Sequence, residues 1–281
     1  MTSTTDDAWN GPRSRRPRVV VLTGGSTGSR YVLSTLAEEV ELCAVVRERP
    51  SRWRTLKLLM RRSRRLGWFY LLDRVLLGVY SKVRLQRHAA ACSAYRAVQQ
   101  TRDCKPACPI LSVGSVNDER VIELLHTIKP ELVIVLGTSI LREPVLQSAA
   151  CFVNLHVGIT PLYRGAHGGF WAAANGDYDN VGVTLHRVDK GIDTGQILQQ
   201  GKFAFDPATD NLLTLAAKSA VVGAEILKQW LRRNRGGYLH SPTVAPPQGQ
   251  SKLFYSPGLR DYLGFERMNK KRAPQPTQHA A

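Results

Sequence analysis

The sequence predicts an α/β fold in which helices flank a mostly parallel sheet. Residues 18–23 form a β-branched run that ends in a glycine turn, and residues 26–39 follow with helical apolar spacing. A strand, a glycine turn and a helix in this order are typical of the opening of an α/β sheet. Residues 132–136 are a continuous apolar run, which is typical of a strand covered on both faces.

The other elements follow in order along the chain. Asn117 is a plausible cap for the helix that starts there, and Pro130 ends it. A further helix begins at Phe170 and Trp171. The pattern predicts strands at 40–46, 110–113, 151–157, 181–188 and 196–205, and helices at 117–128 and 212–230.

Composition divides the chain into a main domain at residues 18–235 and two polar ends. Residues 1–17 are rich in Ser, Thr, Asp and Arg, which predicts a disordered tail. Residues 236–281 are basic and contain Pro242, Pro246, Pro247 and Pro257, which favours an extended, partly disordered tail.

Most of the unusual charge lies outside the central part of the chain. The formal net charge is +17, which implies attraction to polyanions or phosphorylated substrates. Residues 47–88 hold thirteen Arg and Lys against two acids, and form a basic helical insertion with one apolar stripe. This insertion could pack on the domain, cap a site or lie on an anionic membrane. RNA contact is a further interpretation, although no recognised RNA-binding module is present.

A group of polar side chains predicts chemistry near the middle of the chain. Asn154 and His156 are two residues apart on a strand, so both project to the same side. Asp193 lies on a tight turn between Gly191 and Gly195, from which its carboxylate could reach the pair. No Ser or Cys nucleophile is beside them, so the trio suits acyl transfer to an outside nucleophile.

Three spaced motifs resemble the folate-dependent formyltransferases, which act on glycinamide ribonucleotide, methionyl-tRNA or sugar amines. They are N-x-H at Asn154 and His156, P-x-Y-R-G at 161–165, and G-V-T-x-H-x-V-D-x-G-I-D-T-G at 182–195. The resemblance implies a Rossmann-like catalytic domain at 18–235, 10-formyltetrahydrofolate as the formyl donor and no metal. In this reading Asn154 and a protonated His156 stabilise the oxyanion, and Asp193 orients His156 and relays a proton.

The resemblance also suggests where ligands bind. It implies a folate site formed by Thr138, Ile140, Leu141, Val188, Asp189, Lys190 and Gly191, and an amine site formed by Gly24, Gly25, Ser26, Thr27, Tyr163, Arg164 and Gly165. The glycine turn also places backbone N–H groups at a helix N-terminus, which favours an anion. It does not fit G-x-G-x-x-G, so NAD binding is weakly indicated.

The expected function is N-formylation of a primary amine, preferably a nucleotide- or lipid-linked aminosugar. The alternatives are a glycinamide ribonucleotide formyltransferase, a formyltetrahydrofolate hydrolase and a noncatalytic basic scaffold that binds RNA or anionic lipid. The C-terminal stretch is too short for the barrel of transfer-RNA formyltransferases, which disfavours that substrate, and no specific nucleic-acid partner is predicted. No secretory pattern or 18-residue apolar run is present, so we expect a cytoplasmic location, with peripheral contact at the inner membrane surface as an alternative.

Overall fold

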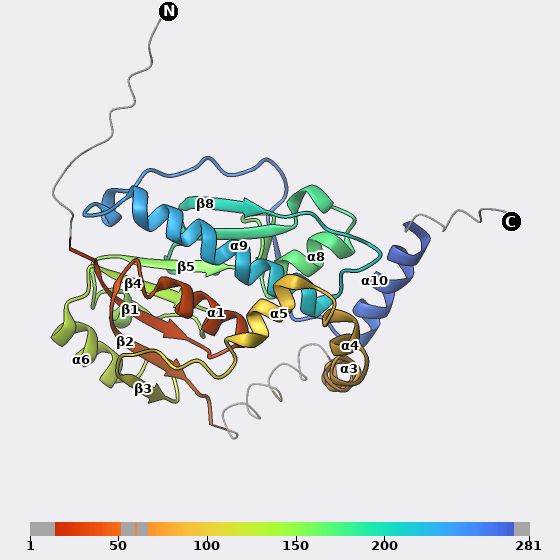
Figure 1. Cartoon of the computed structure of the whole chain (residues 1–281), viewed down its shortest axis with the longest axis horizontal. Helices are drawn as coiled ribbons and strands as arrows, with labels where there is room; N and C mark the ends of the chain where they lie inside the picture. The colour runs from red at the N-terminus through yellow and green to blue at the C-terminus, as the bar shows by residue number, and fades with distance from the viewer. Residues whose placement is uncertain (1–14, 52–59, 61–66, 273–281) are drawn as a thin grey trace, which may run out of the picture.

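The computed structural model describes residues 15–51, 60 and 67–272, and its centre is a seven-stranded sheet with the order β3-β2-β1-β4-β5-β7-β8 (Figure 1). Strands β1 to β5 pair in parallel, whereas β7 and β8 are antiparallel. The predicted α/β class with a mostly parallel sheet is therefore confirmed. The strands span Arg18–Thr23 (β1), Glu41–Glu48 (β2), Ile110–Val113 (β3), Leu132–Leu136 (β4), Phe152–His156 (β5), Gly182–Arg187 (β7) and Ile197–Lys202 (β8).

Alternate residues of the central strands enter two different hydrophobic layers. Val19 and Val21 pack with helices α1 (Thr27–Leu36) and α9 (Leu212–Arg233), whereas Val20 and Leu22 pack with α6 (Glu119–Ile128) and α7 (Glu143–Leu146). This period of two is the pattern of a strand buried on both faces. Helix α5 (Ser93–Gln100) packs beside α1 and α9.

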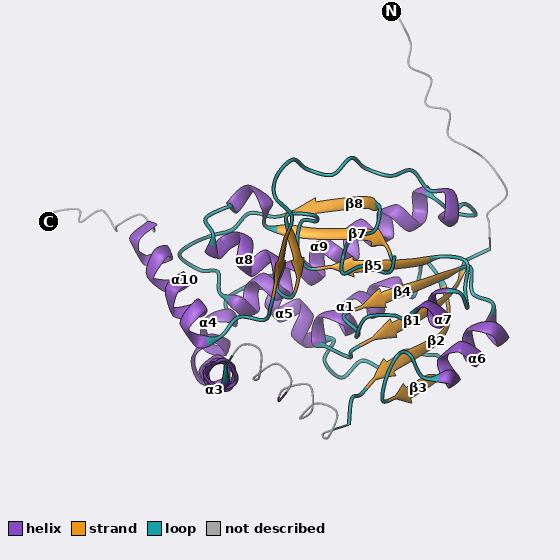
Figure 2. Cartoon of the chain, turned by 180° about the vertical axis from the view of Figure 1, so that it is seen from behind, coloured by secondary structure: helices purple, strands orange, loops and turns teal. Residues whose placement is uncertain are grey.

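The carboxyl ends of three strands meet at one edge of the sheet (Figure 2). The register pairs Thr23 of β1 with Leu136 of β4, and Val135 of β4 with Asn154 of β5. The chain turns in opposite directions on either side of β1 and β4, which makes this edge the point where open α/β sheets bind ligands.

A third hydrophobic cluster joins segments that are distant in sequence. It contains residues of α3 (Trp68–Tyr80), α8 (Gly168–Ala174) and α10 (Leu259–Arg272), and of the short parallel strands β6 (Tyr163–Gly165) and β9 (Lys252–Phe254). The prediction of an extended C-terminal segment is wrong for residues 259–272, because Tyr262 and Phe265 are buried on a helix. The short elements are a π-helix at Ser81–Leu85, α4 at Gln86–Ala89, and 3-10 turns at Tyr178–Asn180 and Tyr238–His240.

Several boundaries differ from the predicted ones. Helix α6 is capped by Asp118, whose Oδ1 accepts from the Arg120 N–H, so the prediction of Asn117 as the cap is wrong. Asn117 instead joins two loops, because its side chain donates to the Ile140 carbonyl and accepts from the Arg142 N–H. Residues 1–14 of the tail predicted at 1–17 and residues 52–59 and 61–66 of the basic insertion lie outside the described residues.

Candidate active site

The sheet edge brings Asn154, His156 and Asp193 into direct contact. His156 Nδ1 lies 3.3 Å from Asp193 Oδ2, and Asn154 Nδ2 donates to Asp193 Oδ1 over 3.3 Å. Two of the three come from β5, and the third comes from the turn between β7 and β8. The three side chains that the sequence singled out therefore form one cluster.

The backbone of the turn holds Asp193 in place. Its φ of 52° is left-handed, a region that Asp and Asn tolerate better than most residues. The Gly165 N–H donates to Asp193 Oδ2 over 2.8 Å, which ties the turn to β6. Two residues later, a side chain at Gly195 would collide with the Arg187 carbonyl oxygen, so glycine is required there for the turn to close.

His156 is buried with both ring nitrogens engaged. Its Nε2 lies 2.8 Å from the Tyr163 carbonyl oxygen, which can only accept, so Nε2 carries a proton. Burial lowers the pKa of His156, and the opposing influence of Asp193 does not restore it. The expectation of a protonated His156 is therefore opposed by burial, which favours the neutral imidazole with its Nδ1 lone pair turned to Asp193.

Asp193 remains ionised in this setting. Burial by itself would raise its pKa, but the close approach of the His186 and His156 rings and the hydrogen bond from the Gly165 N–H together lower it. The Nδ1 lone pair of His156 and an Asp193 oxygen thus face one another across 3.3 Å. A proton delivered between them would be held by both acceptors.

His186 is a fourth member of the site that sequence reasoning missed. Its Nδ1 lies 2.7 Å from the Arg187 carbonyl oxygen, while Nε2 lies 3.0 Å from Asn154 Nδ2 and 3.4 Å from Asp193 Oδ1. With the proton on Nδ1, Nε2 accepts from the Asn154 amide and fixes its orientation. The x-H-x of the third motif was the available signal, but only the antiparallel register Asn154↔His186 brings the two side chains together.

The histidine titration follows from these contacts. We expect His156 to titrate below pH 6.5, the value of a free histidine, and Asp193→Asn to lower its pKa further because the carboxylate favours the imidazolium. A folded pKa below the unfolded one means that the contribution of His156 to the unfolding free energy is present above about pH 6.5 and is lost as the pH falls. Titration of ¹⁵N-labelled histidine by NMR measures both shifts; a higher pKa in Asp193→Asn would contradict this arrangement.

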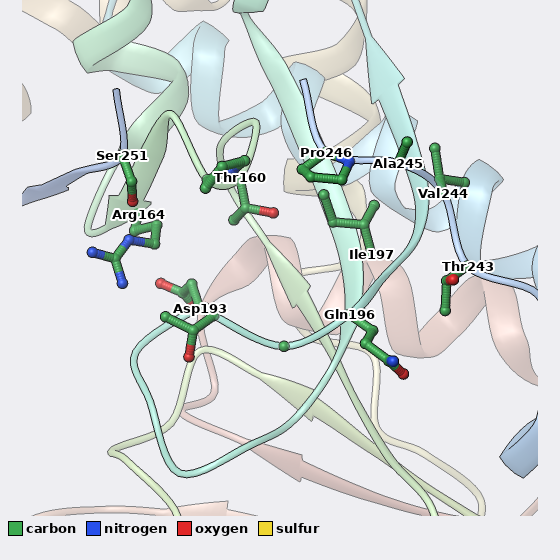
Figure 3. A pocket seen from close by; sticks show the side chains of 13 residues that line it. Thr160, Arg164, Asp193, Gln196, Ile197, Thr243, Val244, Ala245, Pro246 and Ser251 are labelled. Atoms are coloured by element: carbon green, nitrogen blue, oxygen red, sulfur yellow. The ribbon is translucent and has the colours of Figure 1, made fainter. Parts of the chain in front are cut away.

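A cleft of about 640 Å³ opens at Asp193 (Figure 3). One wall is formed by Thr160, Pro161 and Arg164, and the floor by residues 193–197. The remaining lining residues are 243–246, on the side of Ile197, and Ser251, beside Arg164, and all of them belong to the segment predicted as a tail (Figure 3). The C-terminal segment therefore contributes to the site, a role that its Pro-rich composition did not indicate.

The residues expected to bind folate occupy two adjoining loops. Leu141 and Val188 pack in the same hydrophobic layer, and Lys190 pairs with Glu143 at 2.9 Å. Asp189 accepts from the Gly191 N–H, and the Thr138 hydroxyl donates to the Ser139 carbonyl. Ile140 remains 56% exposed. None of these residues lines the cleft at Asp193, so the two loops form a separate surface at the same sheet edge.

The glycine turn expected to bind the amine packs closely on the end of β4. The Gly24 N–H donates to the Leu136 carbonyl, and a side chain at Gly24 would collide with the Gly137 carbonyl. Ser26 caps α1, which begins at Thr27, by accepting from the Ser29 N–H. A cation stands beside this turn, because a Cβ added at Gly25 would lie 3.4 Å from Arg47 Nε.

The P-x-Y-R-G motif contributes mainly backbone groups. The Tyr163 ring is buried, its hydroxyl donates to Asp177, and its carbonyl faces His156. The Gly165 N–H binds Asp193, as described above. Arg164 lines the cleft and donates to the Ile192 carbonyl over 3.2 Å. Tyr163 thus faces the site through its main chain rather than its phenol.

Comparison with known proteins identifies the family. Residues 81–231 match the family described as formyl transferase, which is more than half of the chain and includes Asn154, His156 and Asp193. The chain belongs to the formyl transferase family. The resemblance seen in the three motifs is thereby confirmed, and the family match also covers most of α9.

Individual relatives are matched over less than half of their own length. A methionyl-tRNA formyltransferase of Thermodesulfovibrio yellowstonii is 34% identical over 155 residues, which are 54% of this chain and 48% of the relative. The chain thus spans about half the length of the curated relatives it matches.

Solved structures share the fold at low identity. A 4-N formyltransferase from Francisella tularensis has a TM-score of 0.52 at 14% identity, and covers 94% of this chain and 90% of its own. A phosphoribosylglycinamide formyltransferase from Bacillus halodurans has a TM-score of 0.50 at 16% identity, and covers 77% of this chain and 94% of its own. Both likenesses concern the fold alone.

Proposed function

We propose that this formyl transferase family member moves a formyl group from 10-formyltetrahydrofolate to a primary amine. The observation that carries the proposal is the contact of Asp193, which lines the cleft, with both Asn154 and His156. The trio offers an amide donor and two proton acceptors. Amine attack on a formyl carbon needs both kinds of group, because negative charge develops on the formyl oxygen and the amine loses a proton.

Asn154 would stabilise the oxyanion, and Asp193 and His156 would accept the proton. Asn154 Nδ2 donates to His186 over 3.0 Å and to Asp193 over 3.3 Å, and a formyl oxygen would replace the longer contact. A well-aligned donor of this kind is worth about 3 kcal/mol to the transition state. Asp193 and His156 Nδ1 would accept the amine proton between them and pass it to the leaving nitrogen of the donor as its bond to the formyl carbon breaks, while Tyr163 holds the other side of the ring.

The two loops at 138–141 and 188–191 have a surface that fits the folate. They combine the exposed side chain of Ile140 with backbone N–H and C=O groups, which suits the faces and edges of a heteroaromatic ring. When bound, the folate would supply the activated formyl group. Thr138, Ile140 and Leu141 would hold one side of the ring, and residues 188–191 the other.

The amine substrate is proposed to carry an anionic group, as in a nucleotide- or lipid-linked aminosugar. Arg47 lies beside Gly25, and burial, together with nearby Arg49 and Arg30, lowers the pKa of its guanidinium, so two further cations lie close to Arg47. Within the part of the chain that the structure describes, no carboxylate pairs with any of the three. An anion bound at the N-terminus of α1 would relieve their mutual repulsion.

Arg47→Gln is expected to raise the KM for a phosphorylated amine by about 10- to 100-fold while kcat changes little, because a charge-assisted hydrogen bond contributes about 1.5–3 kcal/mol to binding. Arg233→Gln at the exposed end of α9 is the matched control. Steady-state kinetics with and without the phosphate group on the amine measure the effect. An equal rise in KM for the amines with and without the phosphate group would show that Arg47 does not recognise the anion.

The first experiment is turnover of 10-formyltetrahydrofolate followed by absorbance, with aminosugar nucleotides, glycinamide ribonucleotide and methionyl-tRNA supplied separately. Release of tetrahydrofolate that depends on an aminosugar supports the proposal. Release with glycinamide ribonucleotide or methionyl-tRNA alone would reassign the acceptor. Release without any amine would indicate a hydrolase, and absence of both turnover and folate binding would leave a noncatalytic basic scaffold.

A further inference from the structure

Helix α3 and the π-helix that continues it at Ser81–Leu85 carry an apolar face that the described residues leave exposed. Seven apolar side chains at helical spacing are between 44% and 64% exposed: Trp68, Phe69, Leu72, Val75, Leu76, Val79 and Val83. The rings of Trp68 and Phe69 stack with their centroids 4.0 Å apart at the start of the helix. A helix of this length presents a stripe about 20 Å long. Isolated exposed apolar residues are ordinary, whereas a continuous stripe marks an interaction site.

The opposite side of the same helix holds it on the domain. Leu77 and Leu85 are buried with Phe170 and Tyr262, and the Tyr80 hydroxyl donates to Glu266 of α10. Asp73 is turned inward, where it accepts from the Arg260 N–H. The only acid between residues 68 and 89 is thus directed away from the exposed stripe. The stripe is fixed in place rather than free to fold back.

Positive charge accompanies the stripe on the chain. Lys82, Arg84 and Arg87 are exposed at the C-terminal end of the stripe, and residues 47–88 as a whole carry thirteen Arg and Lys against two acids. This charge favours one of two possible partners for the stripe, a second copy of the chain or an anionic surface. A second copy of the chain would bring the same excess of cations against itself, whereas an anionic surface would be attracted.

We propose that the exposed face of α3 docks the protein on an anionic lipid bilayer. Trp68, Phe69 and the aliphatic side chains would enter the interface, and Lys82, Arg84 and Arg87 would lie at the phosphate level. Figures 1 and 2 show that strands β1, β4 and β5 point toward the side of the molecule where α3, α4 and α10 lie. Docking would therefore set the candidate active site on the membrane side.

This binding is peripheral. No helix among residues 15–51 and 67–272 is long and apolar enough to cross a membrane. The inference does not depend on the proposed transfer reaction, because lipid binding is measured without folate or amine. It would nevertheless explain how an amine acceptor attached to a lipid could reach the cleft.

The test is flotation of the full chain with vesicles of phosphatidylcholine alone or mixed with phosphatidylglycerol. We expect binding to the mixed vesicles that weakens with salt. The triple variant Trp68→Ser, Phe69→Ser, Leu72→Ser should bind at least about 1000-fold more weakly, because burial of each side chain contributes about tenfold or more. Lys82→Gln, Arg84→Gln and Arg87→Gln should each cost about fivefold at low salt.

Controls separate docking from misfolding and from self-association. Ile110→Ser, Leu239→Ser and Tyr255→Ser remove exposed apolar side chains outside α3 and should leave vesicle binding unchanged. The thermal unfolding temperature of the α3 triple variant should equal that of a control variant that combines these three substitutions. Equal binding to neutral and anionic vesicles, or unchanged binding of the α3 variant, would overturn the proposal. So would a dimer in sedimentation velocity that the α3 variant abolishes, since a second copy would then be the occupant.

Discussion

Replacement of Asp193 by Asn is expected to lower kcat by about 10²–10⁴-fold while the affinity for the folate changes little. The amide keeps the shape of the carboxylate and tolerates the left-handed φ of 52°. Its oxygen can still accept from the Gly165 N–H. What it loses is the negative charge that faces His156 Nδ1, and with it the ability to take the amine proton.

The measurement is single-turnover kinetics together with titration of folate binding to the same protein. Asp179→Asn is the matched control, because Asp179 is exposed on the short turn after α8. Normal turnover in Asp193→Asn would contradict the assignment of Asp193 as a proton acceptor. Loss of folate binding alongside turnover would mean that Asp193 holds the donor instead.

Trp230→Ala is expected to lower the free energy of unfolding by about 3–5 kcal/mol. Trp230 is 2% exposed near the end of α9 and packs against Tyr238, with the ring centroids 5.3 Å apart. Helix α9 covers one face of the sheet, so the cavity would open where the sheet and helix layers meet. The indole N–H has no partner among the described residues, so Trp230→Phe should cost much less than Trp230→Ala.

Chemical denaturation of the two Trp230 variants measures the difference. Trp68→Ala removes the same side chain from a position that is 64% exposed and should change the unfolding free energy by no more than about 0.5 kcal/mol. A similar loss in Trp68→Ala would show that α3 contributes to the core through its outer face. That result would also argue against the docking surface proposed for it.

Local sequence predicted the sheet well, most clearly for β1 and β4, whose residues are buried on both faces. The runs at 18–23, 110–113 and 132–136 coincide with β1, β3 and β4 to the residue. The glycine turn and the capped start of α1 follow equally from local chemistry. Helix caps and element ends were less determined, since Asn117 and Asp118 are both good caps and only the loop contacts of Asn117 chose between them.

The catalytic candidates could be predicted from the sequence only in part. Residue spacing placed Asn154 and His156 on one side of a strand, and the motif added Asp193. The neutral state of His156 depends on its burial, which no local pattern reports. The place of His186 depends on the antiparallel pairing of β5 with β7, which sets residues 32 positions apart side by side.

The structure of the C-terminal segment could not be predicted from its local composition either. Its prolines and basic residues are locally typical of an unfolded tail, yet β9 pairs with β6, Tyr262 and Phe265 of α10 enter a core, and residues 243–246 wall the cleft. By itself the sequence determined the α/β class, the motifs of a formyl transferase and the amphipathic character of α3. Only the tertiary structure decided which face of α3 stays exposed, because burial depends on what α8 and α10 cover.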